Sequence, residues 1–201
     1  MSPEAKPTPF TAWQTVSCAD TAYIWRAQMA GFLSMVVSDY LVADTGGLEV
    51  RLLSVIPLAT MNGGDVMNQG EALRYLAEIT WNPDAIVENR TLDWTVVDPK
   101  TIKVATGNGA ARGEMTFILD EQGLIISASA PARGYLENGK TTSKPWHGRF
   151  WNYQHISGRL IPVEGEVAWT LDDGDFIYWR GRIERWEGAS SEFHPIEPQS
   201  I

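Results

Sequence analysis

The sequence predicts a mainly β protein, an antiparallel curved sheet or incomplete β-barrel of about 10–11 strands with one helix packed across its concave face. Segments that alternate in polarity with period two, rich in β-branched and aromatic residues, fill most of the 201 residues. Short turns join these segments, which favours antiparallel neighbours. Helical periodicity is clear in a single segment, residues 68–82, so a helix is expected to close one side of the sheet.

The strand segments are expected to pair as hairpins because turn residues separate them. An early strand covers residues 21–29, and a first hairpin (34–43 with 48–55) turns at Asp44-Thr45-Gly46-Gly47. The later pairs are 92–97 with 101–106, 112–119 with 124–130, and 148–155 with 160–169 followed by 176–186. Residues 57–67 are expected to form a loop that leads into the helix.

The predicted helix has recognisable ends. Asn68 is placed to cap its first turn, with Glu71 at the capping-box position three residues later, and Pro83 stops it. One side of the helix is mostly apolar. The other side carries a polar stripe made of Glu71, Arg74, Tyr75, Glu78 and Asn82.

The polar stripe has three interpretations. It is a solvated face with ion pairs worth about 0.2–0.5 kcal/mol each, a pair of carboxylates turned toward a cleft beside Arg74 and Tyr75, or an anchor that holds the helix to the sheet through Arg74. Sequence leaves the direction of the stripe open, so no catalytic residue is assigned.

Tryptophan is frequent, with nine residues, and most of them lie in or beside expected strands. They form either the core and its rim or an aromatic-lined apolar pocket. Strict alternation along residues 176–186 places Phe176 and Tyr178 on one face and Trp179 on the other. The candidate ligand-binding residues are Glu71, Arg74, Tyr75, Glu78, Trp81, Trp25, Trp169 and Trp179.

Composition excludes several classes of partner. A formal net charge of −9 argues against nucleic acid, which requires clustered Lys and Arg. Cys18 is the single cysteine, and the three histidines lack metal-ligand spacing, so neither a metal site nor a cofactor is expected. No run approaches the roughly 18 apolar residues of a membrane span, so no integral membrane segment is expected.

The N-terminal residues lack the basic and apolar regions of a signal peptide. A soluble cytoplasmic protein is therefore expected, or a periplasmic one if a longer precursor exists. Residues 1–9 are expected to be a flexible arm, residues 10–188 a single β-rich domain, and residues 189–201 a tail.

Residues 70–78, Gly-Glu-Ala-Leu-Arg-Tyr-Leu-Ala-Glu, together with Trp81 and Pro83, resemble the signature of an uncharacterised, mainly prokaryotic family that carries only a domain-of-unknown-function label. Segments within roughly residues 10–187 fit the same resemblance. The order of elements is also similar to that of bacterial lipoprotein-carrier half-barrels. That second resemblance implies an apolar cavity plugged by helices, as a fold-level analogy.

The leading hypothesis is a protein that binds an apolar or lipid-like small ligand in a cavity between sheet and helix. One alternative is an enzyme that uses the Glu/Arg/Tyr cluster on the helix. The other is a non-catalytic scaffold or dimerisation module with exposed Trp at an interface. The sequence does not indicate the oligomeric state.

Overall fold

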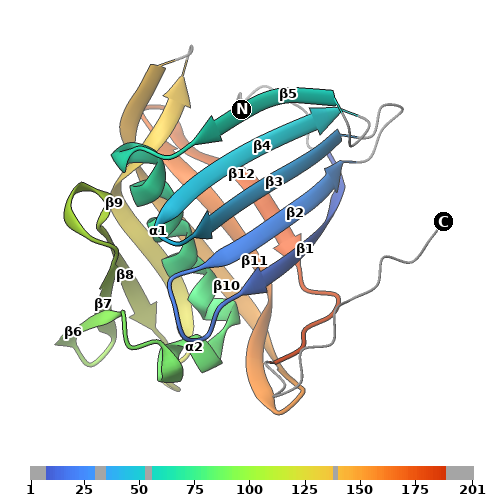
Figure 1. Ribbon diagram of the computed structural model, residues 1–201. Helices are drawn as coiled ribbons and strands as arrows, with labels where there is room; N and C mark the ends of the chain where they lie inside the picture. Colours follow the sequence, from blue (N-terminus) through green and yellow to red (C-terminus); the bar gives the residue numbers. More distant parts are fainter. Residues whose placement is uncertain (1–7, 30–34, 53–55, 138–139, 189–201) are drawn as a thin grey trace.

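The chain forms two antiparallel sheets with a helix between them (Figure 1). The computed structural model describes residues 8–29, 35–52, 56–137 and 140–188. Within these residues the sheets have five and seven strands, both in sequential order. The predicted mainly β, antiparallel architecture with one helix across its inner side is confirmed, and the strands divide between two sheets.

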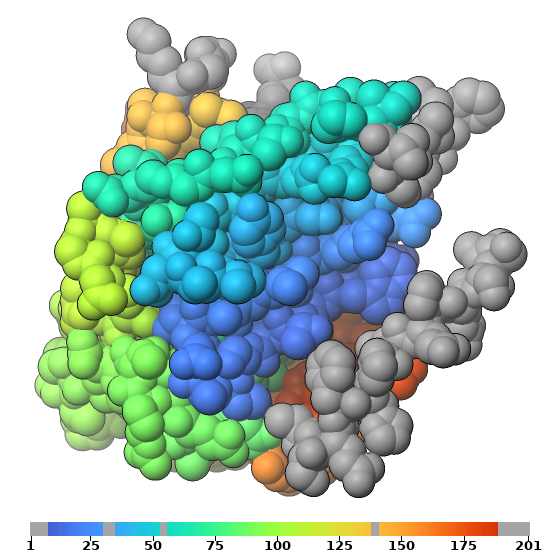
Figure 2. All heavy atoms as spheres, in the orientation of Figure 1, coloured from blue at the N-terminus to red at the C-terminus, as the bar shows by residue number. Residues whose placement is uncertain are grey.

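The first sheet runs in the order β1-β2-β3-β4-β5 and forms the near face of the molecule in Figure 2. Its strands are β1 (Phe10–Val16), β2 (Tyr23–Met29), β3 (Met35–Val42), β4 (Thr45–Leu52) and β5 (Ile56–Asn62). The loop expected at residues 57–67 is wrong, because β5 pairs with β4 there. Pro57 disguises this strand in the sequence, and an edge strand with a bulge beside it tolerates the missing N–H.

The second sheet runs in the order β12-β11-β10-β9-β8-β7-β6. Its strands are β6 (Asp93–Asp98), β7 (Thr101–Thr106), β8 (Gly113–Leu119), β9 (Ile125–Glu137), β10 (Lys140–Ile156), β11 (Arg159–Leu171) and β12 (Gly174–Arg182). A 3₁₀ turn, η2 (Gly109–Ala111), joins β7 to β8. All of the predicted hairpins therefore form, with ends shifted by a few residues.

The main helix, α1 (Asp65–Glu78), starts one turn earlier than predicted. Gly64, at φ 82°, is its N-cap, and Asn68 does not cap it. The Asn68 side chain instead accepts a hydrogen bond of 2.9 Å from the backbone N–H of Gly46 in β4. Asn68 therefore ties the second turn of the helix to the first sheet.

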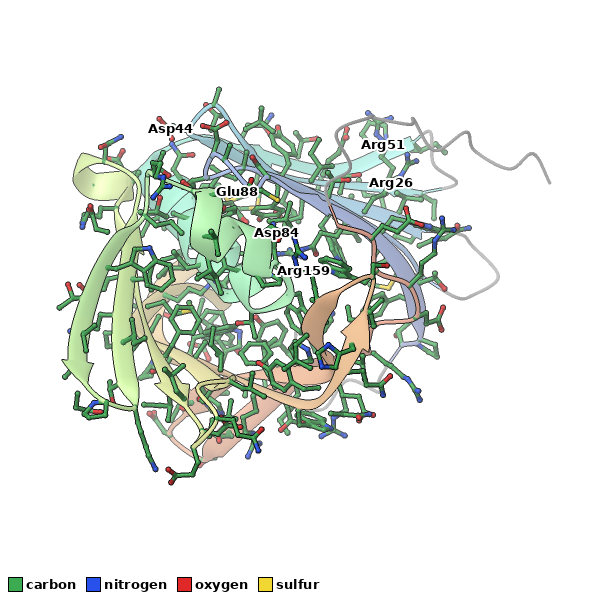
Figure 3. The ribbon with its side chains drawn as sticks, turned by 90° about the horizontal axis from the view of Figure 1, so that it is seen from below. Arg26, Asp44, Arg51, Asp84, Glu88 and Arg159 are labelled. Atoms are coloured by element: carbon green, nitrogen blue, oxygen red, sulfur yellow. The ribbon has the colours of Figure 1, made fainter. Side chains whose placement is uncertain are left out.

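The end of the predicted helix is divided among three elements. α1 ends at Glu78, a 3₁₀ turn η1 (Ile79–Trp81) follows, and α2 (Pro83–Glu88) begins after Asn82. The Asn82 side chain accepts a hydrogen bond from the N–H of Ala85, so it caps α2 and does not belong to the polar stripe of α1. An ion pair of 2.5 Å between Asp84 and Arg159 then ties α2 to β11 (Figure 3).

Helix α1 lies between the two sheets, as Figures 1 and 3 show from two directions. Its apolar residues Leu73 and Leu76 are buried in one core cluster with Met115, Phe117 and Trp146 of the second sheet. A helix with one neighbour needs a single apolar stripe, but a helix between two sheets is enclosed on both sides. The side chains of the polar stripe are therefore directed at protein.

The expected arm and tail fall mostly outside the described residues, which begin at residue 8 and end at residue 188. The first strand starts at Phe10. Residues 1–7 and 189–201 stay outside the description, so the arm and the tail remain predictions.

Close contact between α1 and β4 depends on Gly46. A Cβ added at Gly46 would lie 2.6 Å from Glu71 Cγ and 3.1 Å from Glu71 Cβ. Gly46→Ala is therefore expected to lower the free energy of unfolding by about 1–3 kcal/mol, because the helix or the strand has to move. Chemical denaturation monitored by circular dichroism measures the change.

Gly70→Ala is the matched control, because a Cβ on Gly70 in the same helix meets no atom within 4 Å. That substitution is expected to raise stability by up to about 1 kcal/mol through helix propensity. Equal effects of the two substitutions would contradict a steric role for Gly46.

Candidate functional site

A buried group of ionisable side chains joins α1 to the first sheet, and we call it the Arg74 cluster: Tyr23, Asp39, Glu71, Arg74 and Glu78. Arg74 forms an ion pair with Asp39 of β3, and its Nε lies 3.4 Å from Glu78 Oε1. The Tyr23 hydroxyl is hydrogen-bonded to Glu71, and it lies 3.3 Å from Asp39 Oδ1. Of the three interpretations, the geometry supports an anchor between helix and sheet.

Two aromatic rings of β2 enclose the Arg74 guanidinium. Its central carbon lies 4.8 Å from the ring centroid of Trp25 and 5.2 Å from that of Tyr23. Cation–π contacts of this kind contribute roughly 0.5–2 kcal/mol, with the larger values for desolvated groups. Trp25 therefore lies beside the helix, where it supports the predicted site residue Arg74.

Negative groups outnumber positive ones in the Arg74 cluster, and the imbalance acts on Glu71. Burial raises the pKa of Glu71 to about 7, with a further contribution from the nearby charge of Asp39. Arg133, the Tyr23 hydrogen bond and Arg74 act in the opposite direction but do not cancel the shift. Burial and the charge of Asp39 therefore favour the protonated, neutral form of Glu71.

Tyr75, predicted to share the polar stripe, lies apart from the Arg74 cluster. Its hydroxyl donates to the carbonyl of Ser17 at 3.1 Å and accepts from Asn89 Nδ2 at 2.7 Å. Burial raises the pKa of Tyr75 to about 12. The side chain is fully buried, so Tyr75 connects α1 to the turn after β1 and to the segment after α2.

The second sheet presents a row of aromatic rings toward α1, and a bulge creates it. The register of β11 and β12 shifts between Val167 and Ala168, so Tyr178 is the extra residue. Phe176 and Tyr178 pack against the core, and the ring of Trp179 lies 6.0 Å from that of Trp81. The alternation that placed Trp179 opposite Phe176 and Tyr178 is therefore wrong, because it assumed a strand without a bulge.

The other predicted tryptophans lie in two separate places. Trp81 donates its indole N–H to the carbonyl of Pro162 at 2.8 Å and packs edge-on against Phe150. Trp169 contacts Tyr135, with ring centroids 5.2 Å apart, and stacks with Tyr178 at 5.9 Å. The predicted site residues are thus distributed over four environments around α1 and do not converge on one point.

Beyond α1, the inner side of the first sheet is apolar and only partly covered. The register places its residues on the same face as Trp25 and Asp39. Each of them stays partly exposed, and Met61 is 44% exposed. We call this surface the open apolar face, and it consists of Met29, Met35, Val37, Leu48, Val50 and Met61.

Sequence reasoning missed Tyr23 and Asp39, the two residues of the sheet that complete the Arg74 cluster. A usable signal was present in the alternation of β3, where Asp39 occupies an inward position between Val37 and Leu41. A carboxylate at such a position requires a cationic or hydrogen-bonding partner. Arg74 was the natural candidate, because it lies on the polar side of the helix.

The described part of the chain contains no candidate metal site. No group of three or more His, Cys, Asp or Glu side chains there is arranged to hold a metal ion. The carboxylates of the Arg74 cluster have Arg74 and Tyr23 as partners.

Stability is expected to depend on pH through Glu71. Its pKa is about 7 in the fold against a reference value of 4.5, so the folded state binds the proton more tightly. The stability that Glu71 contributes is complete below pH 4.5 and is lost as the pH rises through 7, by up to roughly 3 kcal/mol. Thermal unfolding at pH 5 and pH 8 should show a larger decrease for wild type than for Glu71→Gln.

Glu184→Gln removes an exposed carboxylate and serves as the control, with the pH dependence of wild type. An unchanged pH dependence in Glu71→Gln would show that Glu71 ionises normally.

Three comparisons relate this chain to known proteins. Among solved structures, a LolA superfamily protein from Nitrosomonas europaea is similar, with 9% sequence identity and a TM-score of 0.34 over 89% of this chain and 86% of that one. A search of curated proteins finds no match. None of the helices formed by the described residues is long and apolar enough to cross a membrane.

The family comparison covers nearly all of the described strands and all of the helices. It matches a family of unknown function, DUF6544, over residues 1–181, a span that includes both sheets and the Arg74 cluster. The chain therefore belongs to the DUF6544 family.

Proposed function

We propose that this protein binds an apolar or lipid-like small ligand on the open apolar face, between the first sheet and the aromatic row of the second. The observation that carries the proposal is the partial exposure of inward-facing Met, Val and Leu side chains. Inward positions of a sheet are normally covered by other elements. Apolar side chains that keep contact with solvent there favour an apolar occupant.

The two sides of the proposed site differ in character. The first sheet supplies flexible and branched aliphatic side chains, including Met29, Met35 and Met61. Methionine adapts its shape to ligands of different outline. The second sheet supplies rigid rings from Phe176 and Tyr178, both partly buried. Such a combination suits a long, flexible apolar molecule better than a small polar substrate.

The Arg74 cluster has a supporting role in this proposal. Its ion pairs and hydrogen bonds hold α1 against β2, β3 and β4. The inward position of β3 next to Asp39 is Val37, which is partly exposed and belongs to the open apolar face. A helix fixed in this way sets one wall of the site.

Two other functions receive less support. An enzyme that uses Glu71 is favoured by a pKa of about 7, but Glu71 is a buried residue, 7% exposed, and its carboxyl is hydrogen-bonded to Tyr23. A dimerisation module is favoured by Trp13, which is 56% exposed on the outer side of β1. Light scattering measures the oligomeric state, and a strictly monomeric protein would contradict a dimerisation module.

Binding to the open apolar face is tested with Val50→Asp. A carboxylate at this inward position is expected to weaken binding of an apolar fluorescent probe, such as an anilinonaphthalene sulfonate, by at least about tenfold, because the charge loses solvation on binding. Fluorescence titration of the probe into the folded protein measures the affinity.

Ile24→Asp introduces the same charge on the outer side of the same sheet, where Ile24 is 56% exposed, and is expected to bind the probe as wild type does. Equal losses in both variants, or no binding by wild type, would contradict the proposed site.

A further inference from the structure

We propose that the ligand is an anionic amphiphile, whose head group pairs with Arg133 while its chain lies along the open apolar face. A single-chain carboxylate is the simplest such molecule. This inference rests on the proposed function and adds the chemistry of the head group.

Arg133 is an inward-facing cation of the second sheet. It lies on β9, two residues before the buried Tyr135. The central carbon of its guanidinium lies 5.2 Å from the ring centroid of Trp146 and 5.9 Å from that of Trp169. Both rings are buried, so the Arg133 side chain lies on an aromatic floor that faces α1.

The two inward arginines have different partners. Arg74 forms ion pairs with Asp39 and Glu78. Arg133 takes part in none of the ion pairs formed by the described residues, and its contacts there are with aromatic rings. A guanidinium carries five N–H donors, and a ring face satisfies none of them fully. An anionic head group would supply acceptors in the planar, paired geometry that guanidinium favours.

Arg133 and the open apolar face are both related to the Arg74 cluster. The charge of Arg133 is close enough to Glu71 to act on that carboxyl. The Glu71 carboxyl is hydrogen-bonded to the hydroxyl of Tyr23 in the first sheet, and that hydroxyl lies 3.3 Å from Asp39 Oδ1. Val37 lies on β3 two residues before Asp39 and is part of the open apolar face. The cation and the apolar surface therefore approach the Arg74 cluster from opposite sheets.

Arg133 is partly exposed, although it points inward. Its guanidinium can therefore exchange water for a ligand without opening the core. The combination of one inward cation, an aromatic floor and a facing aliphatic surface matches a molecule with one anionic end and one apolar end. A neutral apolar molecule would use the aliphatic surface and leave Arg133 solvated.

The test compares dodecanoate with dodecanol, which share a chain and differ in head-group charge, by isothermal titration calorimetry on the full chain. Wild type is expected to bind dodecanoate at least about tenfold more tightly than dodecanol. Arg133→Gln should reduce dodecanoate binding to the level of dodecanol and leave dodecanol unchanged. Arg133→Lys should keep part of the preference, because it keeps the charge without the planar fork.

Arg26→Gln is the matched control, because it removes the same charge from the outer, exposed side of β2 (Figure 3). It should keep the dodecanoate preference. Equal binding of the two molecules by wild type would overturn the inference and leave the proposed function standing. An equal loss of both in Arg133→Gln, with circular dichroism unchanged, would reduce Arg133 to a packing residue. Failure of both molecules to bind wild type would overturn the proposed function as well.

Discussion

Burial of the Arg74 cluster between α1 and the first sheet is the interaction on which the arrangement of the molecule depends. Transfer of charged groups out of water is unfavourable unless each finds a partner, and removal of one partner from a buried pair typically destabilises by about 3–5 kcal/mol. Arg74 and Glu78 lie on the same helix, so the pair that depends on the height and rotation of the helix against the sheet is the one between Arg74 and Asp39 of β3. We infer that this buried pair adds little net stability and selects one placement of the helix over displaced ones. The position of the helix in turn decides which part of the sheet is covered.

The same helix uses its two sides in different ways. Leu73 and Leu76 belong to a core shared with the second sheet, where many orientations of similar volume would bury comparable area. The opposite side meets the first sheet through directional contacts, including the hydrogen bond between Asn68 and Gly46. Non-directional burial supplies the association of the layers, and the polar contacts select one alignment. The surface left uncovered by this alignment is the open apolar face, and its extent follows from helix placement.

Most strands and the turns between them were predictable from alternation and turn residues, because each hairpin is encoded locally, as in residues 101–119. Strand β1 was not predicted, and a loop was predicted in place of β5. The helix was predictable from its periodicity, but its start was not. Asn68 and Glu71 form a convincing capping pattern, yet both side chains contact the first sheet, a preference no local rule contains. The bulge beside Val167 was equally hidden, since a register shift depends on the partner strand. Within the site, Arg74 and Glu78 could be named from the helix alone. Tyr23 and Asp39 required knowledge of which strands lie opposite.

The sequential order of strands in both sheets has a consequence for how the chain folds. Every neighbour within a sheet is also the next strand in sequence, so strand pairing closes only short loops and has a low entropic barrier. Contacts between the two meanders are different, because they join parts of the chain that are far apart. Helix α1 follows β5 directly and leads toward β6, so it is positioned to bring the layers together after each has formed. In this topology the slow, non-local part of the search is concentrated in the docking of a single element.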